Sequence, residues 1–169
     1  WNNLNVGFRT FISGLFAGIG TIGILLYNGV MVGAFQFFFY EQGELRESFL
    51  TIWIHGTIEI STIILAGCAG LTLGKGLVFP GTYSRLQSLQ KYGIRALKIM
   101  VGIAPLIVTA GFIEGFVTRY TDAPDILRLG IILASLAFIL LYFVWYPYQK
   151  SKEGFQDSIK DIKIPPSKE

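Results

Sequence analysis

The sequence is short of charged residues, and it contains a single histidine and a single cysteine. Charged residues make up 15% of its 169 residues, whereas a soluble domain carries about a quarter. The lone Cys68 excludes an internal disulfide, and its apolar surroundings indicate a small buried residue. There is also no Gly-x-Ser-x-Gly motif, no phosphate-binding loop and no two-histidine zinc motif. We therefore expect a protein that is not an enzyme, and no cofactor is implied.

Long apolar runs separate the charged residues of this sequence. Hydrophobic residues make up 52% of the chain and the mean hydropathy is +0.55. The charges gather in blocks between runs of about 20 apolar residues or more, which is enough to cross a bilayer. The sequence therefore predicts an all-α, polytopic transmembrane bundle with about four spans. Residues 1–149 form its single transmembrane domain, and residues 150–169 form a polar, loosely ordered cytoplasmic tail.

The first apolar run, residues 10–40, is too long for one straight span. As a helix it would measure about 45 Å, against a hydrocarbon core of about 30 Å. We expect a break near Asn28-Gly29, with the second half re-entrant, tilted or interfacial. The other spans are predicted at residues 49–73, 99–117 and 126–146.

Between the second and third spans, apolar and basic residues alternate at helical spacing over residues 75–98. This pattern predicts a basic amphipathic helix on the membrane surface. Such a helix either sets the topology or binds anionic lipid or a partner.

The distribution of cations predicts how the chain is oriented. Of the 14 Lys and Arg residues, only Arg46, Arg119 and Arg128 fall in the loops after the first and third spans. Cytoplasmic loops carry an excess of Lys and Arg, and four crossings place both ends on one side, so both termini are predicted to be cytoplasmic. The net charge of +3 lies beside the membrane. We attribute it to topology and contact with the lipid bilayer, and expect no nucleic-acid partner.

Two ionisable residues, His55 and Glu59, lie inside the second apolar run and share a helix face. Such groups are costly in hydrocarbon unless paired or hydrated, so this face is expected to lie against other helices. Glu114 in the third span is a second buried acid. Asn28 either hydrogen-bonds across to the His55 face or is a turn residue. The group is open to three interpretations: a structural polar network, a path for protons or ions, or a metal site with Glu114 as third ligand.

Small residues four apart along the first two spans predict faces where helices pack closely. On the second span they continue the stripe that His55 and Glu59 begin. The positions are Gly14 and Gly18, Gly29 and Gly33, and Ala66, Gly70 and Gly74.

Two motifs resemble a known family. The pattern His55-Gly56-x-x-Glu59, followed by Ala66-Gly-Cys-Ala-Gly-Leu-Thr-Leu-Gly74, is similar to the central motif of the stage II sporulation protein M family, whose members are bacterial polytopic membrane proteins. Upstream, Gly18-Ile-Gly-Thr21 and Tyr27-Asn-Gly-x-x-x-Gly33 resemble the first-span pattern of that family. The resemblance covers Asn5 to about Arg119. Ile54 stands where the family usually has proline, and family members are typically longer at the N-terminus.

The resemblance implies a multi-pass protein of the bacterial cytoplasmic membrane. In spore-forming bacteria the namesake acts in a peptidoglycan-remodelling complex during engulfment, where it recruits and positions a cell-wall hydrolase. We therefore expect a non-enzymatic membrane scaffold that assembles with other membrane proteins, a cell-wall hydrolase among the candidates, or as a homo-oligomer. The alternative is an ion- or proton-coupled transporter or channel, or an intramembrane metal-binding protein, that uses His55, Glu59 and Glu114.

Overall fold

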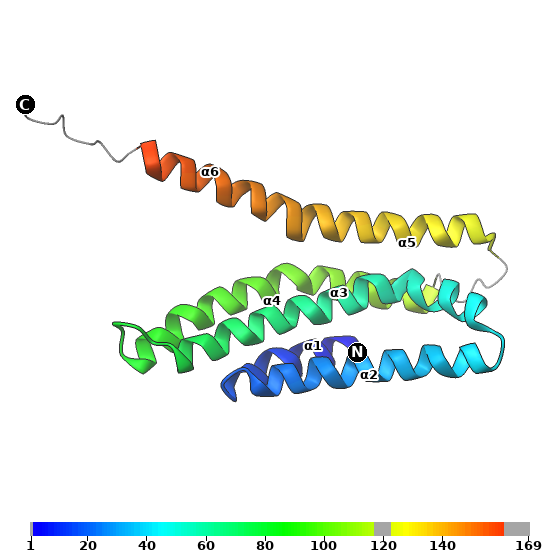
Figure 1. Ribbon diagram of the computed structural model, residues 1–169, viewed down its shortest axis with the longest axis horizontal. Helices are drawn as coiled ribbons and strands as arrows, with labels where there is room; N and C mark the ends of the chain where they lie inside the picture. The colour runs from blue at the N-terminus through cyan, green and yellow to red at the C-terminus, as the bar shows by residue number, and fades with distance from the viewer. Residues whose placement is uncertain (1, 117–122, 161–169) are drawn as a thin grey trace, which may run out of the picture.

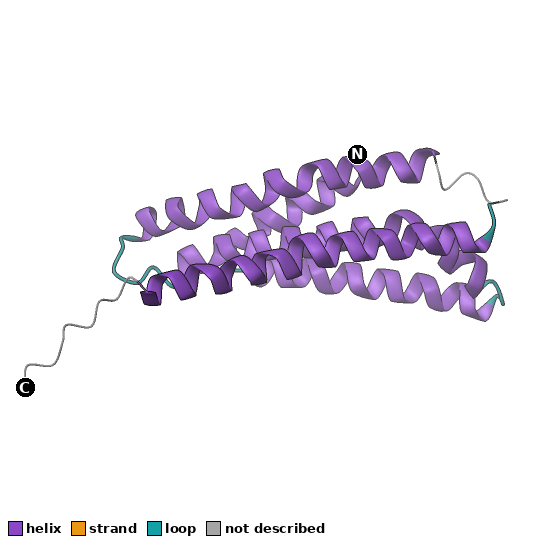
Figure 2. Ribbon diagram, turned by 90° about the horizontal axis from the view of Figure 1, so that it is seen from above, coloured by secondary structure: helices purple, strands orange, loops and turns teal. Residues whose placement is uncertain are grey.

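A computed structural model describes residues 2–116 and 123–160 of the chain. Over these two ranges the chain is helical apart from short turns, and it contains no strand (Figure 2). Four helices are long and apolar enough to cross a membrane. They are α2 (Ile19–Glu41), α3 (Leu45–Val78), α4 (Arg85–Phe116) and the continuous helix that begins with α5 (Asp125–Leu140). The prediction of an all-α bundle with four spans is confirmed.

Helix α3 lies at the centre of the bundle (Figure 1). It packs against α1 (Asn2–Ile12), the short η1 turn (Ser13–Leu15), α2, α4 and α5. Each of the three hydrophobic clusters includes residues of α3. Ala66 packs with Ile103 and Ile107 of α4, Ala69 and Leu73 pack with Phe11 and Ala96, and Leu50 and Ile54 pack with Ile132 of α5.

The break in the first apolar run lies at residues 13–18, so the prediction of a break near Asn28-Gly29 is wrong. Ala17 and Gly18 have left-handed backbone angles, with φ of 54° and 80°, and they reverse the chain between α1 and α2. At Asn28, by contrast, the side-chain nitrogen donates a hydrogen bond to the Ile24 carbonyl at 2.8 Å. This hydrogen bond joins the Asn28 side chain to the carbonyl one turn earlier in the same helix. Helix α2 continues through Gly29 without interruption.

The reversal at residues 13–18 is held against α3 by contact between backbones. A Cβ atom placed on Gly14 would lie 2.6 Å from the carbonyl carbon of Gly70, and one on Gly74 would lie 2.6 Å from the Gly18 nitrogen. Beside this contact, the buried Thr21 hydroxyl donates to the Thr10 carbonyl at 2.9 Å. Small residues permit such close approach, which is how helices gain packing energy where the hydrophobic effect is absent.

The basic segment is the first part of α4, so the prediction of a separate surface helix is wrong. Ser84 and Gln87 begin α4 with a capping box: the Gln87 nitrogen donates to the Ser84 hydroxyl at 3.3 Å, and the Ser84 nitrogen donates to the Gln87 side chain at 3.1 Å. Ser88 and Ala96 are fully buried. Ser88 lies near Gly76, and Ala96 clusters with Ala69. The segment therefore packs its small-residue face against α3, and the helix extends without a break into the third span.

The last span continues beyond its expected end. After α5, a turn of π-helix, η2 (Leu141–Trp145), leads directly into α6 (Tyr146–Lys160). The helix therefore continues into residues 150–160 of the expected tail. Within it, Lys150 forms an ion pair with Glu153 at 2.7 Å, three residues further along the helix. Residues 161–169, and Arg119 in the loop after α4, lie outside the described residues. Cys68 also differs from expectation, because its side chain is exposed.

A set of charged residues joins the beginnings of α3 and α5. The Arg128 guanidinium pairs with Glu47, and Arg46 pairs with Asp125. Arg128 Nε also donates to the Ala123 carbonyl at 2.9 Å, and the Arg128 side chain is only 7% exposed. Buried arginine is tolerated when it is paired and hydrogen-bonded. These contacts fix α5 against α3 at this end of the bundle.

The backbone contact at Gly70 predicts a large effect from one added methyl group. In Gly70→Ala, the new Cβ would lie 2.7 Å from the Thr10 carbonyl oxygen and would also meet the Thr21 side chain. We expect the free energy of unfolding, measured by chemical denaturation of the purified protein, to fall by about 1–3 kcal/mol. The control is Gly102→Ala, where nothing lies within 4 Å of the new atom. If the two variants are equally stable, the close contact is wrong.

Candidate functional site

A groove of about 580 Å³ lies between α2 and α3, and His55 and Glu59 line it. Asn28 and Gln36 face it from α2, and Trp53 lies beside His55 on α3. Most of the remaining lining is apolar, including Leu25, Val32, Phe35, Ile52, Ile60 and Ile63. The groove is therefore mostly apolar with a few polar groups, and it lies between two helices that are long and apolar enough to cross a membrane.

His55 and Glu59 lie on one face of α3, one helical turn apart. The distance from His55 Nε2 to Glu59 Oε2 is 4.0 Å, and their side chains are 13% and 24% exposed. This separation is too long for a hydrogen bond but short enough for an ion pair when the imidazole is protonated. The pair is therefore largely sheltered and still open to a ligand in the groove.

Several polar atoms that line the groove are buried and have no hydrogen-bond partner among the described residues. They are Nδ1 of His55, both amide atoms of Gln36 and Nε1 of Trp53. A buried donor or acceptor without a partner is destabilising by about 1–3 kcal/mol. These atoms are out of contact with solvent, so a ligand, water or another polypeptide can satisfy them only after neighbouring side chains of the groove shift.

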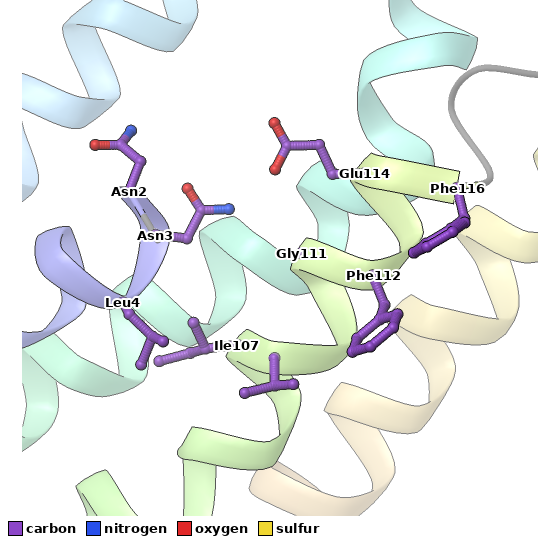
Figure 3. Close-up of a pocket in the computed structure, with 9 residues that line it drawn as sticks. Asn2, Asn3, Leu4, Ile107, Gly111, Phe112, Glu114 and Phe116 are labelled. Atoms are coloured by element: carbon purple, nitrogen blue, oxygen red, sulfur yellow. The ribbon is translucent and has the colours of Figure 1, made fainter.

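Glu114 lies outside the groove, in a second cavity between α4 and α1. This cavity has a volume of about 510 Å³, and Asn2, Asn3 and Ile107 line it with Glu114. Figure 3 shows the Glu114 carboxylate projecting from α4 into the cavity, on the side where Asn2 and Asn3 lie. Glu114 and the His55–Glu59 pair therefore line two separate cavities.

The three-ligand metal site considered from the sequence is not formed. Among the residues whose side chains are described, 2–116 and 123–153, no group of three or more His, Cys, Asp or Glu could hold a metal ion. Asn28 lines the groove, but its side-chain nitrogen is bonded to its own helix at the Ile24 carbonyl. The polar site therefore consists of His55 and Glu59, with Asn28 and Gln36 opposite.

The small residues singled out by their spacing fall into two groups. Ala66, Gly70 and Gly74 lie on the buried face of α3, and Gly14 and Gly18 contact that face. Gly29 and Gly33 behave differently: a Cβ on either would have no neighbour within 4 Å. These two glycines therefore pack against no other described helix of this chain, and Gly29 lines the groove.

Gln36 is the groove residue that the sequence reasoning missed. A signal was available, because Asn28, Val32 and Gln36 recur every four residues and so share one face of α2. Val32 and Gln36 both line the groove with Asn28. The expected break at Asn28-Gly29 separated Gln36 from Asn28 and hid this pattern.

Four helices that are long and apolar enough to cross a membrane, with a groove between α2 and α3, define a polytopic α-helical membrane protein. The family model for Stage II sporulation protein M matches residues 1–119, and the chain belongs to that family. The matched part contains α1 to α4, whereas α5 and α6 follow it. Ile54, which directly precedes the His55-Gly56-x-x-Glu59 pattern, packs in the cluster with Leu50 and Ile132. A search of the curated proteins found no match, and a search of the solved structures found none either.

The placement of His55 and Glu59 predicts that substitutions at the two positions have non-additive effects on the free energy of unfolding. His55→Leu alone removes the imidazole beside the Glu59 carboxylate, whereas the double variant with Glu59→Leu removes both groups together. We expect the double variant to be more stable than the sum of the single effects predicts. A coupling free energy of about 0.5–1.5 kcal/mol is expected, the range found for polar pairs in membranes. Unfolding measurements in bicelles on all four proteins provide the test, and strictly additive effects would show that the residues do not interact.

Proposed function

We propose that this protein is a non-enzymatic membrane scaffold whose groove between α2 and α3 binds a transmembrane helix of a partner protein. The observation that carries the proposal is the set of unpartnered polar atoms on Gln36 and His55. Lipid acyl chains can neither donate nor accept hydrogen bonds. A neighbouring helix with a polar side chain supplies both, and polar side chains are known to join helices in membranes.

The exposed position of α2 supports the same proposal. Within the described part of the chain, α2 packs against α1, η1 and α3, and Thr21 is its one buried residue. Gly29 and Gly33 leave room for the backbone of another helix to approach. Large side chains around them are exposed, among them Tyr27, Met31, Phe35, Phe37 and Phe38.

The family suggests what the partner does. In the namesake the partner complex remodels peptidoglycan and includes a cell-wall hydrolase, and we propose a comparable positioning role here. The turn between α2 and α3 contains only Gln42, Gly43 and Glu44. A turn of this length cannot itself reach a polymer outside the membrane, and we propose that an effect on the cell wall is exerted through the partner.

We also propose that the end of the bundle with the turn between α3 and α4 faces the cytoplasm of a bacterial cell. Lys75, Arg85 and Lys91 gather near this turn, with Arg95 and Lys98 one and two helical turns further along α4. The end of α6 lies at the same end of the bundle (Figure 1). An excess of cations marks the cytoplasmic side of bacterial membrane proteins.

Substitution of Gln36 separates partner binding from folding. Gln36→Leu removes two buried polar atoms without partners, so we expect the unfolding temperature to stay the same or rise. We expect the same change to weaken the complex extracted from native membranes, seen on native gels as a shift toward the monomer. The matched control is Phe37→Leu, an exposed position of α2 that does not line the groove.

A second experiment asks whether the bound helix belongs to another copy of this chain. Two copies with different tags are expressed in one cell and purified through one tag, and recovery of the other tag shows that the copies bind each other.

The proposal fails if Gln36→Leu leaves the complex intact, or if the wild-type protein is itself extracted as a monomer. It also fails if reconstituted protein conducts protons or ions and Glu59→Gln abolishes the flux. That result would establish the transporter alternative.

A further inference from the structure

Positive charge without a matching negative charge collects at the turn between α3 and α4. No Asp or Glu occurs between residues 60 and 113, whereas the same stretch contains Lys75, Arg85, Lys91, Arg95 and Lys98. None of these five cations forms an ion pair with a described residue. The charge is therefore available to an anion from outside this chain.

Two tyrosines hold three of these cations in place. The Tyr92 ring contacts both Lys75 of α3 and Arg95 of α4, with Lys75 Nζ at 5.7 Å and the Arg95 guanidinium carbon at 5.5 Å from its centroid. Lys91 Nζ lies 4.3 Å from the centroid of Tyr83 and donates to its hydroxyl at 3.0 Å. This hydrogen bond lowers the pKa of Tyr83. Cation–π contacts of this kind orient long side chains that would otherwise sample many rotamers.

The cluster lies where the helices leave their apolar stretches. Lys75 directly follows the buried Leu73 and Gly74, and Arg95 directly precedes the buried Ala96. Gly76 brings α3 against α4 here, since a Cβ on it would lie 2.9 Å from Tyr92 Cβ. Tyrosines and cations at the end of an apolar stretch are typical of headgroup depth.

We infer that Lys75, Arg95 and Tyr92, with Lys91 and Tyr83 beside them, form a binding site for the phosphate headgroup of an anionic phospholipid. The position favours a lipid over free phosphate, because the acyl chains of a lipid can lie along the apolar stretches of α3 and α4. Lys75 belongs to α3 and Arg95 to α4, so a headgroup that contacts both cations would bridge the two helices. Anionic lipid should therefore stabilise the hairpin that these helices form.

The test uses the purified full chain in a non-ionic detergent with short-chain phosphatidylglycerol, phosphatidylcholine or inorganic phosphate as probes. We expect phosphatidylglycerol to raise the unfolding temperature in a saturable way, while phosphatidylcholine and inorganic phosphate do not. In the variant with Lys75→Gln and Arg95→Gln, the apparent dissociation constant for phosphatidylglycerol should rise roughly tenfold or more.

The matched control is the variant with Lys150→Gln and Lys152→Gln, which loses the same charge and also disrupts a cation–π pair, that of Lys152 with Tyr148. We expect it to bind phosphatidylglycerol like the wild type. If the affinity for phosphatidylglycerol falls equally in both double variants, the loss of net charge explains the effect and the proposed site is wrong. Equal stabilisation by phosphatidylcholine or by inorganic phosphate would also overturn it. Should the double variant fold poorly, Lys75→Gln alone, at an exposed side chain, gives the same comparison.

Discussion

The backbone contact between α3 and the reversal at residues 13–18 is the constraint on which the rest of this structure depends. Gly70 and Gly74 let Gly14 and Gly18 approach within van der Waals distance, so α1 and α2 are both held against one face of α3. In a bilayer the hydrophobic effect does not drive helices together, and close packing with internal hydrogen bonds replaces it. The contact also fixes where α2 starts, and with it the position of the groove further along.

The same α3 face changes character along its length. Around Gly70 it consists of small residues and is closely packed, whereas around His55 it carries polar groups and, within the described residues, lies along a groove shared with the exposed helix α2. Two ion pairs, Arg128 with Glu47 and Arg46 with Asp125, tie this end of α3 to α5. We propose that the small-residue half of α3 holds the bundle together, that the half around His55 binds a partner, and that the turn between α3 and α4 contacts lipid.

The sequence was sufficient for the general architecture but not for features set by tertiary contacts. Apolar length predicted four spans, and spacing placed Ala66, Gly70 and Gly74 on one face, because both depend on local periodicity. The break at residues 13–18 depends on Gly70 lying opposite Gly14, which no local pattern reveals. The pairing of Glu47 with Arg128, and the place of Gln36 in the groove, likewise depend on how separate helices meet.

The central claim is that α3 crosses the bilayer with the His55–Glu59 groove at membrane depth. Single cysteines at positions 44, 59 and 82, introduced one at a time with Cys68→Ala, test it with a membrane-impermeant maleimide applied to either side. Labelling of position 44 from one side, position 82 from the other side and position 59 from neither is the expected result. Labelling of positions 44 and 82 from the same side, or of position 59 from the water, would contradict the account.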